Sequence, residues 1–411
     1  MHSFNIHPVK LIKALSMALE LAVNGMSSHH WRTALISDRI AKQINLNATD
    51  HQRLLYAALL HDIGAASSWS ERRKIMETTN QGMHRHAEDG YLLLKDSIQL
   101  GDLAEPIRYH HDRWTGGNYS GLKEEKIPLI SRIIHIADRV EVLIRHDEFI
   151  FNQSKHILGV IEKSSGIEFD PTLVAAVQEI AKKESFWLDL VNPNYYEVFF
   201  RSLDVYGAIC YSLDDAINIA EIFATIIDRM SSFTATHSHN VARIAAFLAK
   251  VKGFSADEVK NMKIAGLLHD LGKLAIPNNI LEKPGQLNKE EVVIIRQHTY
   301  YTYRILQEID GFDTIAMWAA YHHETLDGKG YPFRLAADSL PLGSRILAVA
   351  DIFVALTENR PYRDSLPEVR VRAIMTEMVA KGKIDQLVVN NLFANYQEAL
   401  TIMHDEKAIA I

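Results

Sequence analysis

The stretch Gly266-Leu-Leu-His269-Asp270-Leu-Gly272-Lys273 decides how this chain of 411 residues is interpreted. An apolar run ends in an adjacent histidine and aspartate, followed by a glycine and a lysine, which is typical of the end of a helix. One imidazole nitrogen and one carboxylate can bind a metal ion, and the two carboxylate oxygens could bridge two ions. A single His-Asp pair is usually structural, so its meaning depends on the residues around it.

The composition is that of an ordinary globular protein, with 47% hydrophobic and 23% charged residues. A net charge of -7 and the lack of a long Lys/Arg block argue against a DNA or RNA partner. The single cysteine, Cys210, excludes a disulfide framework and a cysteine-based zinc site, whereas 20 histidines favour metal binding by imidazole. The sequence shows no signal peptide and no apolar stretch of about 18 residues, so we expect a cytoplasmic protein without a membrane span.

The His-Asp pattern occurs twice in the chain. The stretch Leu59-Leu-His61-Asp62-Ile-Gly64 lies 208 residues before Leu267-Leu-His269-Asp270-Leu-Gly272, and the same offset relates His29 to His237. The later histidines of the two halves follow at nearly equal intervals. Two unrelated segments would hardly share such spacing, so the chain is interpreted as two copies of one domain.

The repeat predicts domains at about residues 1–190 and 205–411, joined near Val191-Asn-Pro-Asn-Tyr-Tyr, where Asn-Pro is a turn signal. Nearly everything outside the turns has the helical spacing i, i+3, i+4, as in Ile40-Ala41-Lys-Gln-Ile44. Alternating, strand-like runs are scarce. An all-α architecture of two tandem helical bundles is therefore predicted, with ligands that point inward from facing helices.

The second copy offers five imidazoles and two carboxylates, a set that can hold two divalent ions in shells of nitrogen and oxygen. Its predicted metal ligands are His237, His269, Asp270, His298, His322, His323 and Asp351. Seven ligands exceed the four of a closed structural zinc site, so iron, manganese or another first-row ion is expected, with Asp270 as the bridge. The first copy keeps a matching set, made of His29, His61, Asp62, His86, His110, His111 and Asp138.

The second half also carries a series of motifs in a fixed order. They are Thr236-His237-Ser238, His269-Asp270-Leu-Gly-Lys273, Ile276-Pro277, Lys283-Pro-Gly, His322-His323-Glu324-Thr-Leu-Asp327-Gly-Lys-Gly330-Tyr331-Pro332, Arg345-Ile-Leu-Ala-Val-Ala-Asp351 and Arg360-Pro361-Tyr362-Arg363. In this order they resemble the HD superfamily and its HD-GYP branch, and the first half looks like a degenerate copy. The resemblance implies an all-helical fold, two or three iron or manganese ions, and hydrolysis of cyclic dinucleotides such as cyclic di-GMP.

The expected chemistry is that of a two-metal site. Two ions a few ångströms apart lower the pKa of a bridging water and polarise a phosphodiester oxygen. Asp270 and Lys273 are predicted to be catalytic, and the lysine would place a positive charge on the phosphate. Arg360 and Arg363 would present guanidinium groups to phosphate or to a guanine edge. The loop Asp327–Pro332 is expected to form a wall beside the His-His pair.

Several positions depart from the pattern. Ala65 stands where the second copy has Lys273, so the first copy is predicted to bind metal in a regulatory or structural role. Some members of the family recruit a third ion with a Glu one turn before the first ligand, where this chain has Phe233, so two ions are expected. Val354 replaces an Asp usually found three residues after the last ligand, which leaves the support around the site without that carboxylate. Thr302 replaces a glycine and is expected to alter helix packing rather than the ligands.

The predicted function is a phosphodiesterase in which hydroxide held by the metals opens a cyclic dinucleotide, either cyclic di-GMP or cyclic GMP-AMP. The product would be a linear dinucleotide, which could be cleaved further to mononucleotides. A first alternative is an HD-type nucleotidase acting on mononucleotides, against which the Gly-Tyr-Pro loop and the arginine pair argue. A second is a non-catalytic ligand or redox sensor, against which Lys273 and the arginines argue. Exposed helical faces make a homodimer reasonable.

Overall fold

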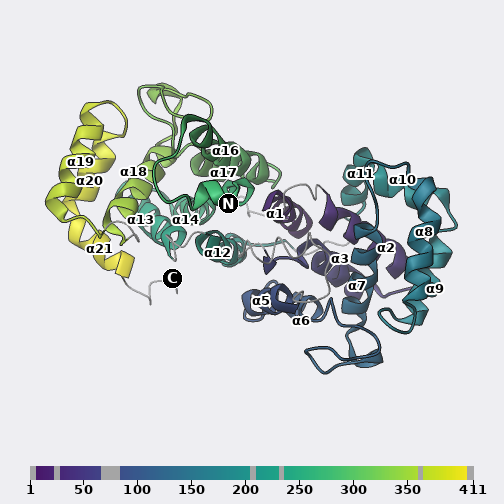
Figure 1. The fold of residues 1–411 in the computed structure, drawn as a ribbon. Coiled ribbons are helices and arrows are strands. Elements are labelled where there is room, and N and C mark those ends of the chain that lie inside the picture. Colours follow the sequence, from purple (N-terminus) through teal and green to yellow (C-terminus); the bar gives the residue numbers. More distant parts are fainter. Residues whose placement is uncertain are drawn as a thin grey trace. The chain divides into compact units, whose positions relative to one another are not determined.

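The computed structural model describes helices and connecting turns, without a β-strand, across residues 6–22, 28–65, 84–203, 210–230, 236–359 and 364–404 (Figure 1). The predicted all-α class is confirmed. The helices divide into two compact units, which meet in the sequence between Cys210 and Tyr211. In these parts of the chain, no helix is both long and apolar enough to cross a membrane.

The first unit is built around α2 and α3, which pack against each other and against α1 and α7. Its described helices are α1 (Pro8–Ala22), α2 (His29–Gln43), α3 (Ala48–Leu60), α5 (His84–Leu94), α6 (Gly101–Arg108), η2 (Glu124–Lys126), α7 (Leu129–Val142), α8 (Ile150–Lys163), α9 (Pro171–Ile180), α10 (Glu184–Val191) and α11 (Pro193–Leu203).

The second unit repeats this plan, with α13 packed against α12, α14 and α18. Its described helices are α12 (Leu213–Met230), α13 (His237–Val251), α14 (Ala256–Leu268), η4 (Leu271–Ala275), α15 (Asn278–Leu281), α16 (Lys289–Leu306), α17 (Asp313–Ala320), η5 (Ala337–Ser339), α18 (Leu342–Thr357), α19 (Glu368–Ala380), α20 (Gln386–Ala394) and α21 (Tyr396–His404).

The turn expected to join the two domains lies inside the first unit. Helix α10 ends at Val191 and α11 begins at Pro193, so the Asn-Pro signal marks a turn between these two helices. The rings of Tyr196 and Phe200 on α11 meet the ring of Trp31 on α2 edge to face, with centroids 6.0 and 4.9 Å apart. This aromatic contact holds α11 to the first unit.

The His-Asp turn at the end of α3 and of α14 depends on a glycine in both units. A Cβ atom built on Gly272 would lie 2.0 Å from the carbonyl oxygen of His298 in α16, and one on Gly64 would lie 2.0 Å from that of His86 in α5. No side chain fits at such a distance from backbone, so the glycine lets the next ligand helix pass directly over the turn.

Thr302 reinforces the same contact in the second unit. Its hydroxyl donates to the carbonyl oxygen of His269 at 3.1 Å and accepts the N–H of Gly272 at 2.9 Å. The residue that replaces the family's glycine therefore ties α16 to the His-Asp turn and leaves the ligand side chains in place.

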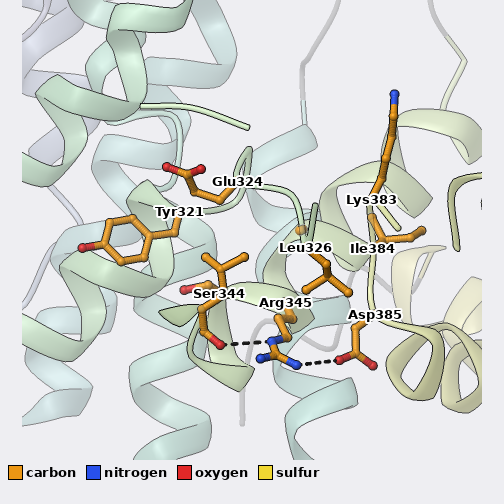
Figure 2. Close-up of a pocket in the computed structure, with 10 residues that line it drawn as sticks. Tyr321, Glu324, Leu326, Ser344, Arg345, Lys383, Ile384 and Asp385 are labelled. Carbon is orange, nitrogen blue, oxygen red and sulfur yellow. Dashed lines mark hydrogen bonds and ion pairs between the residues drawn. The ribbon is translucent and has the colours of Figure 1, made fainter. Parts of the chain in front are cut away.

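An arginine at the start of α18 joins distant parts of the second unit (Figure 2). The guanidinium of Arg345 donates to the carbonyl oxygen of Leu340 at 3.0 Å and to the carboxylate of Asp385, the N-cap of α20, at 3.1 Å. In the first unit Arg132 of α7 reaches Asp170, the N-cap of α9, in the same way at 2.5 Å. Each arginine thereby positions the helix that carries the last ligand aspartate.

The glycine contact predicts a stability difference within the first unit. Gly64→Ala should lower the free energy of unfolding by at least about 2 kcal/mol, because the added Cβ would collide with the backbone of α5. Gly159→Ala in α8 is the matched control, since a Cβ there meets no atom within 4 Å, and it should stabilise the unit by about 0.5–1 kcal/mol. Thermal and urea unfolding of both variants measure this. Equal stability of the two variants would contradict the argument.

Candidate metal and active site

The seven predicted ligands of the second unit come together from α13, the turn after α14, α16, the end of α17 and α18. Within each of three overlapping groups, ligand atoms lie within 4.8 Å of one another. The groups are His237, His269 and Asp351; His269, Asp270 and His322; and His298, His322 and His323. The groups share members, so they form one continuous cluster.

Asp270 lies at the centre of this cluster. Its Oδ2 is 3.2 Å from Nε2 of His269, and its Oδ1 is 3.4 Å from Nε2 of His298. The two oxygens thus face different histidines, as a bridging ligand requires. Burial opposes ionisation, but the neighbouring His269 and the ammonium of Lys273 hold the pKa of Asp270 well below its usual range. Lys273 places its Nζ 2.5 Å from Oδ2.

Three histidines are oriented by the backbone. His269, His298 and His322 each donate Nδ1–H to the carbonyl oxygen three residues earlier, at 2.7, 2.7 and 2.6 Å. This assignment makes Nε2 the unprotonated nitrogen, and in the described residues none of these buried Nε2 atoms has a hydrogen-bond partner. Burial lowers the pKa of His298 to about 3 and that of His322 well below its usual range. Buried imidazoles whose Nε2 atoms lack a hydrogen-bond partner fit a metal site.

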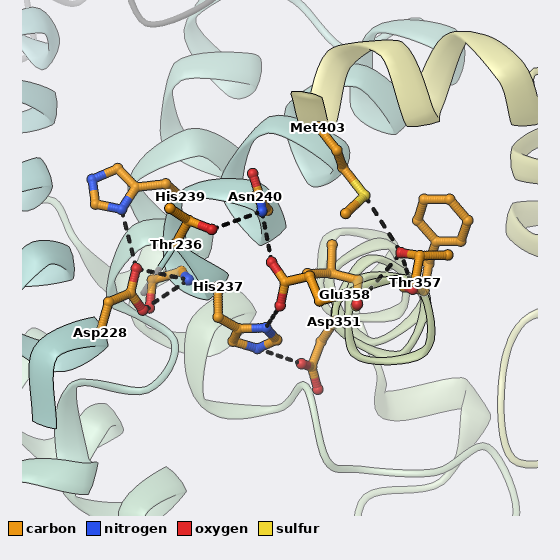
Figure 3. A network of polar contacts seen from close by, with 12 residues as sticks. Asp228, Thr236, His237, His239, Asn240, Asp351, Thr357, Glu358 and Met403 are labelled. Carbon is orange, nitrogen blue, oxygen red and sulfur yellow. Dashed lines mark hydrogen bonds and ion pairs between the residues drawn. The ribbon is translucent and has the colours of Figure 1, made fainter. Parts of the chain in front are cut away.

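His237 is held by carboxylates instead (Figure 3). Its Nε2 lies 3.1 Å from Oδ1 of Asp351 and its Nδ1 lies 3.1 Å from Oε2 of Glu358, whose other oxygen accepts from Asn240 at 2.6 Å. Although burial disfavours the imidazolium, the hydrogen bonds to Asp351 and Glu358 raise the pKa of His237 to about 10. Since a ligand nitrogen must be unprotonated, a metal ion would take the place of the Nε2 proton.

Glu358 supplies the carboxylate that Val354 was expected to leave missing. In the first unit Glu141 of α7 binds Nδ1 of His29 and accepts from Nε of Arg32 at 2.7 Å. Val354 occupies the position of Glu141 in the repeat, but Glu358 lies one helical turn further along the same face and reaches the equivalent histidine. The support around the first ligand is therefore moved by four residues rather than lost.

The Gly-Tyr-Pro loop borders the ligands. The ring of Tyr331 lies 4.9 Å from the ring of His323, and the guanidinium of Arg296 lies 5.0 Å from the Tyr331 centroid. The buried carboxylate of Glu324 accepts the N–H of Phe333 at 2.6 Å and so fixes the far side of the loop. As predicted, the loop lies beside the His-His pair, where Tyr331 of the loop and Arg296 of α16 form an aromatic and cationic wall.

The first unit assembles its predicted ligands in the same way. Oδ1 of Asp62 lies 3.3 Å from Nε2 of His86 and 3.8 Å from that of His110, while Oδ2 lies 3.3 Å from Nε2 of His61. Nε2 of His111 is 3.1 Å from that of His86. Asp62 therefore divides its oxygens between two groups of histidines, as Asp270 does.

The group on the Oδ2 side of Asp62 holds one histidine that the motif spacing did not predict. His29 lies with Nε2 3.3 Å from Nε2 of His61 and 3.4 Å from Oδ1 of Asp138. His30 joins the group, since one ligand atom each from His29, His30, His61 and Asp62 lies within 4.8 Å of the others. The first unit therefore brings together eight possible ligands.

Comparison with known proteins connects this geometry to a family. Residues 26–143 and 221–388 each match a model of the HD domain. The chain is 31% identical over 379 residues to the 3'3'-cGAMP-specific phosphodiesterase 1 of Vibrio cholerae, in an alignment that covers 90% of this chain and 88% of that protein. The chain belongs to the HD superfamily.

The similarity extends through both HD domains. The 3'3'-cGAMP-specific phosphodiesterase 3 of Vibrio cholerae is 29% identical, with 97% of this chain and 95% of that protein covered. A crystal structure of a cyclic GMP-AMP-specific phosphodiesterase from Vibrio cholerae matches with a TM-score of 0.67 and 26% identity, over 97% of this chain and 98% of that chain. These alignments therefore span both HD domains of this chain.

The two HD domains differ in the cations near their ligands. In the second domain Lys273 contacts the central carboxylate, whereas Ala65 at this position of the first domain is buried and uncharged. Arg360 and Arg363 lie outside the described residues, as does Phe233. Two residues escaped the sequence reasoning: Glu358, which helical spacing from Val354 could have indicated, and His30, which directly follows a predicted ligand.

Glu358 gives the site a testable outer support. Glu358→Ala should weaken metal binding by the second HD domain by about 10–100-fold, because the ring of His237 loses its orienting carboxylate. Titration of the metal-free protein with Mn²⁺ measures this, and the exposed Glu377→Ala variant serves as the control.

A relocation variant tests whether the carboxylate acts through His237. The triple variant Glu358→Ala, Val354→Glu and Asn240→Arg moves the carboxylate to position 354 and gives it an arginine partner, as Glu141 and Arg32 have in the first domain. This variant should recover part of the metal affinity lost in Glu358→Ala. Unchanged binding in Glu358→Ala alone would show that the contact does not support the metal site.

Proposed function

We propose that the second HD domain hydrolyses a 3',5'-phosphodiester bond of a cyclic dinucleotide. The observation that carries this proposal is that the seven predicted ligands, Asp270 among them, form one cluster, with the ammonium of Lys273 2.5 Å from Oδ2 of Asp270. The relatives aligned along nearly the whole chain are named 3'3'-cGAMP-specific phosphodiesterases. We therefore propose 3'3'-cGAMP as the substrate to test first, with cyclic di-GMP beside it. The product would be a linear dinucleotide, open to further cleavage to mononucleotides.

Two divalent ions, of iron or manganese, are the proposed cofactors of this domain. One would be held on the side of His237, His269 and Asp351, and the other on the side of His298, His322 and His323, with Asp270 between them. When bound, such ions lower the pKa of water and polarise a phosphoryl oxygen. The imidazole and carboxylate donors, without sulfur, suit these metals.

The residues around the cluster would handle the substrate. Lys273 carries its charge beside the central carboxylate and is one quarter exposed, so it can shift toward a phosphate as negative charge develops there. Tyr331 and Arg296 form a wall on which a base could stack. Arg360 and Arg363 are proposed to orient the phosphates or a guanine edge.

The first HD domain is proposed to bind metal in a regulatory or structural role. It keeps the imidazole and carboxylate groups around Asp62. It lacks a counterpart of Lys273, because Ala65 stands there. A domain without a lysine beside its central carboxylate would turn over poorly.

If the second domain is catalytic and the first is not, two matched substitutions should lower activity by different amounts. Asp270→Ala should lower kcat/KM for 3'3'-cGAMP by at least about 100-fold, because it removes the group between both ligand clusters. Asp62→Ala should lower it by less than about tenfold. Anaerobic purification with metal analysis, then incubation with 3'3'-cGAMP, cyclic di-GMP and GMP and chromatography of the products, measures both. An enzyme silenced only by Asp62→Ala would refute the assignment.

The proposed role of Lys273 predicts that its removal slows hydrolysis without reducing metal binding. Lys273→Ala should lower kcat by about 100-fold, equivalent to about 2.7 kcal/mol, with metal content preserved. Lys260→Ala is the control, since that lysine pairs with Asp214 rather than with a ligand. A change in kcat of less than about threefold, which is under 1 kcal/mol, would remove Lys273 from the mechanism.

A further inference from the structure

The two HD domains differ at the residue that follows their first ligand histidine. The second domain has Ser238, whose Oγ donates to Oδ1 of Asp228 at 2.7 Å and so turns away from the metal ligands. The first domain has His30, whose backbone N–H is accepted by Glu20 at 3.0 Å, the acid in the place of Asp228. Because Glu20 binds only the backbone, the imidazole of His30 is left for another partner.

The imidazole of His30 points into the ligand cluster. It is 2% exposed, and in the described part of the chain neither ring nitrogen has a hydrogen-bond partner. Nε2 lies 3.7 Å from Oδ2 of Asp62, beyond hydrogen-bond distance. Its ring centroid is 5.1 Å from that of His61 and 5.4 Å from that of His29. A buried polar ring without a partner, surrounded by ligand residues, requires an explanation.

The separations fit the shell of one ion. A first-row ion about 2.0–2.2 Å from each nitrogen or oxygen keeps neighbouring ligand atoms about 3–3.5 Å apart, and more when they stand opposite each other. The ligand atoms of His29 and His61 are 3.3 Å apart, those of His61 and Asp62 are 3.3 Å apart, and those of His30 and Asp62 are 3.7 Å apart. A small contraction would bring all four groups onto a single cation.

We propose that His30 is a ligand of the metal ion bound by His29, His61, Asp62 and Asp138 in the first HD domain. This inference rests on the proposed metal binding by that domain and adds a ligand that the second domain lacks. The chemical class of the bound species is a divalent first-row cation that accepts nitrogen and oxygen donors.

The extra ligand closes the site. Five protein donors leave one position on a six-coordinate ion, whereas the four equivalent donors of the second domain leave two. Hydrolysis at such an ion needs room for both a water and a phosphoryl oxygen. His30 thus makes the first domain hold its ion more firmly and takes away a position that the reaction would use.

Metal affinity is the first test. In a full-length chain with Asp270→Ala and His298→Ala, which disable the second site, and with Cys210→Ser, competition with a chromophoric chelator gives the affinity of the first domain for Mn²⁺ and Co²⁺. His30→Ser, which installs the residue of the second domain, should weaken binding at least about tenfold. His156→Ser, at an exposed position of α8, should leave it unchanged.

A spectroscopic variant tests direct contact and remains informative if His30→Ser fails to fold. In the same background, His30→Cys loaded with Co²⁺ should show thiolate-to-cobalt charge-transfer absorption, which arises only when the sulfur binds the metal, and His156→Cys should not. Unchanged affinity in His30→Ser, or a folded His30→Cys without this band, would overturn the assignment. If the background chain binds no metal, the assignment fails as well, while the hydrolytic role of the second domain still stands on its own assay.

Discussion

The buried carboxylate of Asp270 is the group on which the second HD domain depends. Removing a carboxylate from water costs several kcal/mol unless cations or hydrogen bonds compensate for it. Here the compensating charge comes from Lys273, 2.5 Å away, while the imidazoles of His269 in the same turn and His298 on α16 face the two carboxylate oxygens. These groups belong to separate elements, so α16 must pass close to the turn, and Gly272 permits that approach. The close approach of α16 to the turn is therefore required both by the packing of the helices and by the buried charge of Asp270.

The first HD domain meets the same constraint without a lysine. Burial opposes ionisation of Asp62, yet the charge of His61 in the same turn holds its pKa well below the usual range. The outer carboxylate is also placed differently, since Glu141 pairs with Arg32 in this domain whereas Glu358 pairs with Asn240 in the other. The repeat therefore preserves what the buried aspartate needs and varies the residues that surround it.

Much of this arrangement follows from sequence alone. Helical periodicity is a local signal, and it predicts the all-α class. The intervals that the two copies share predict which seven residues of each domain lie together. Glu358 was missed because the family pattern points to position 354 and its partner His237 lies 121 residues away, although helical spacing places Glu358 one turn after Val354. The Asn-Pro sequence after Val191 is equally typical of a turn between two helices and of a linker between two domains, so the sequence does not distinguish them. The packing of α11 on Trp31 shows that this turn lies within the first unit.

The persistence of ligands in both domains is not by itself a sign that both are hydrolytic. Removing one partner of a buried, paired charge leaves the other uncompensated, which typically costs 3–5 kcal/mol, so a domain that loses a ligand beside Asp62 risks its fold. Lys273 is different, because its side chain is 26% exposed and its removal leaves His269 and His298 against Asp270. Alanine at position 65 therefore has little effect on the stability of the fold, whereas loss of a histidine beside Asp62 would destabilise it. The ligand residues of a domain are therefore explained by the stability of its fold, whereas a hydrolytic role depends on the residues beside them, such as Lys273.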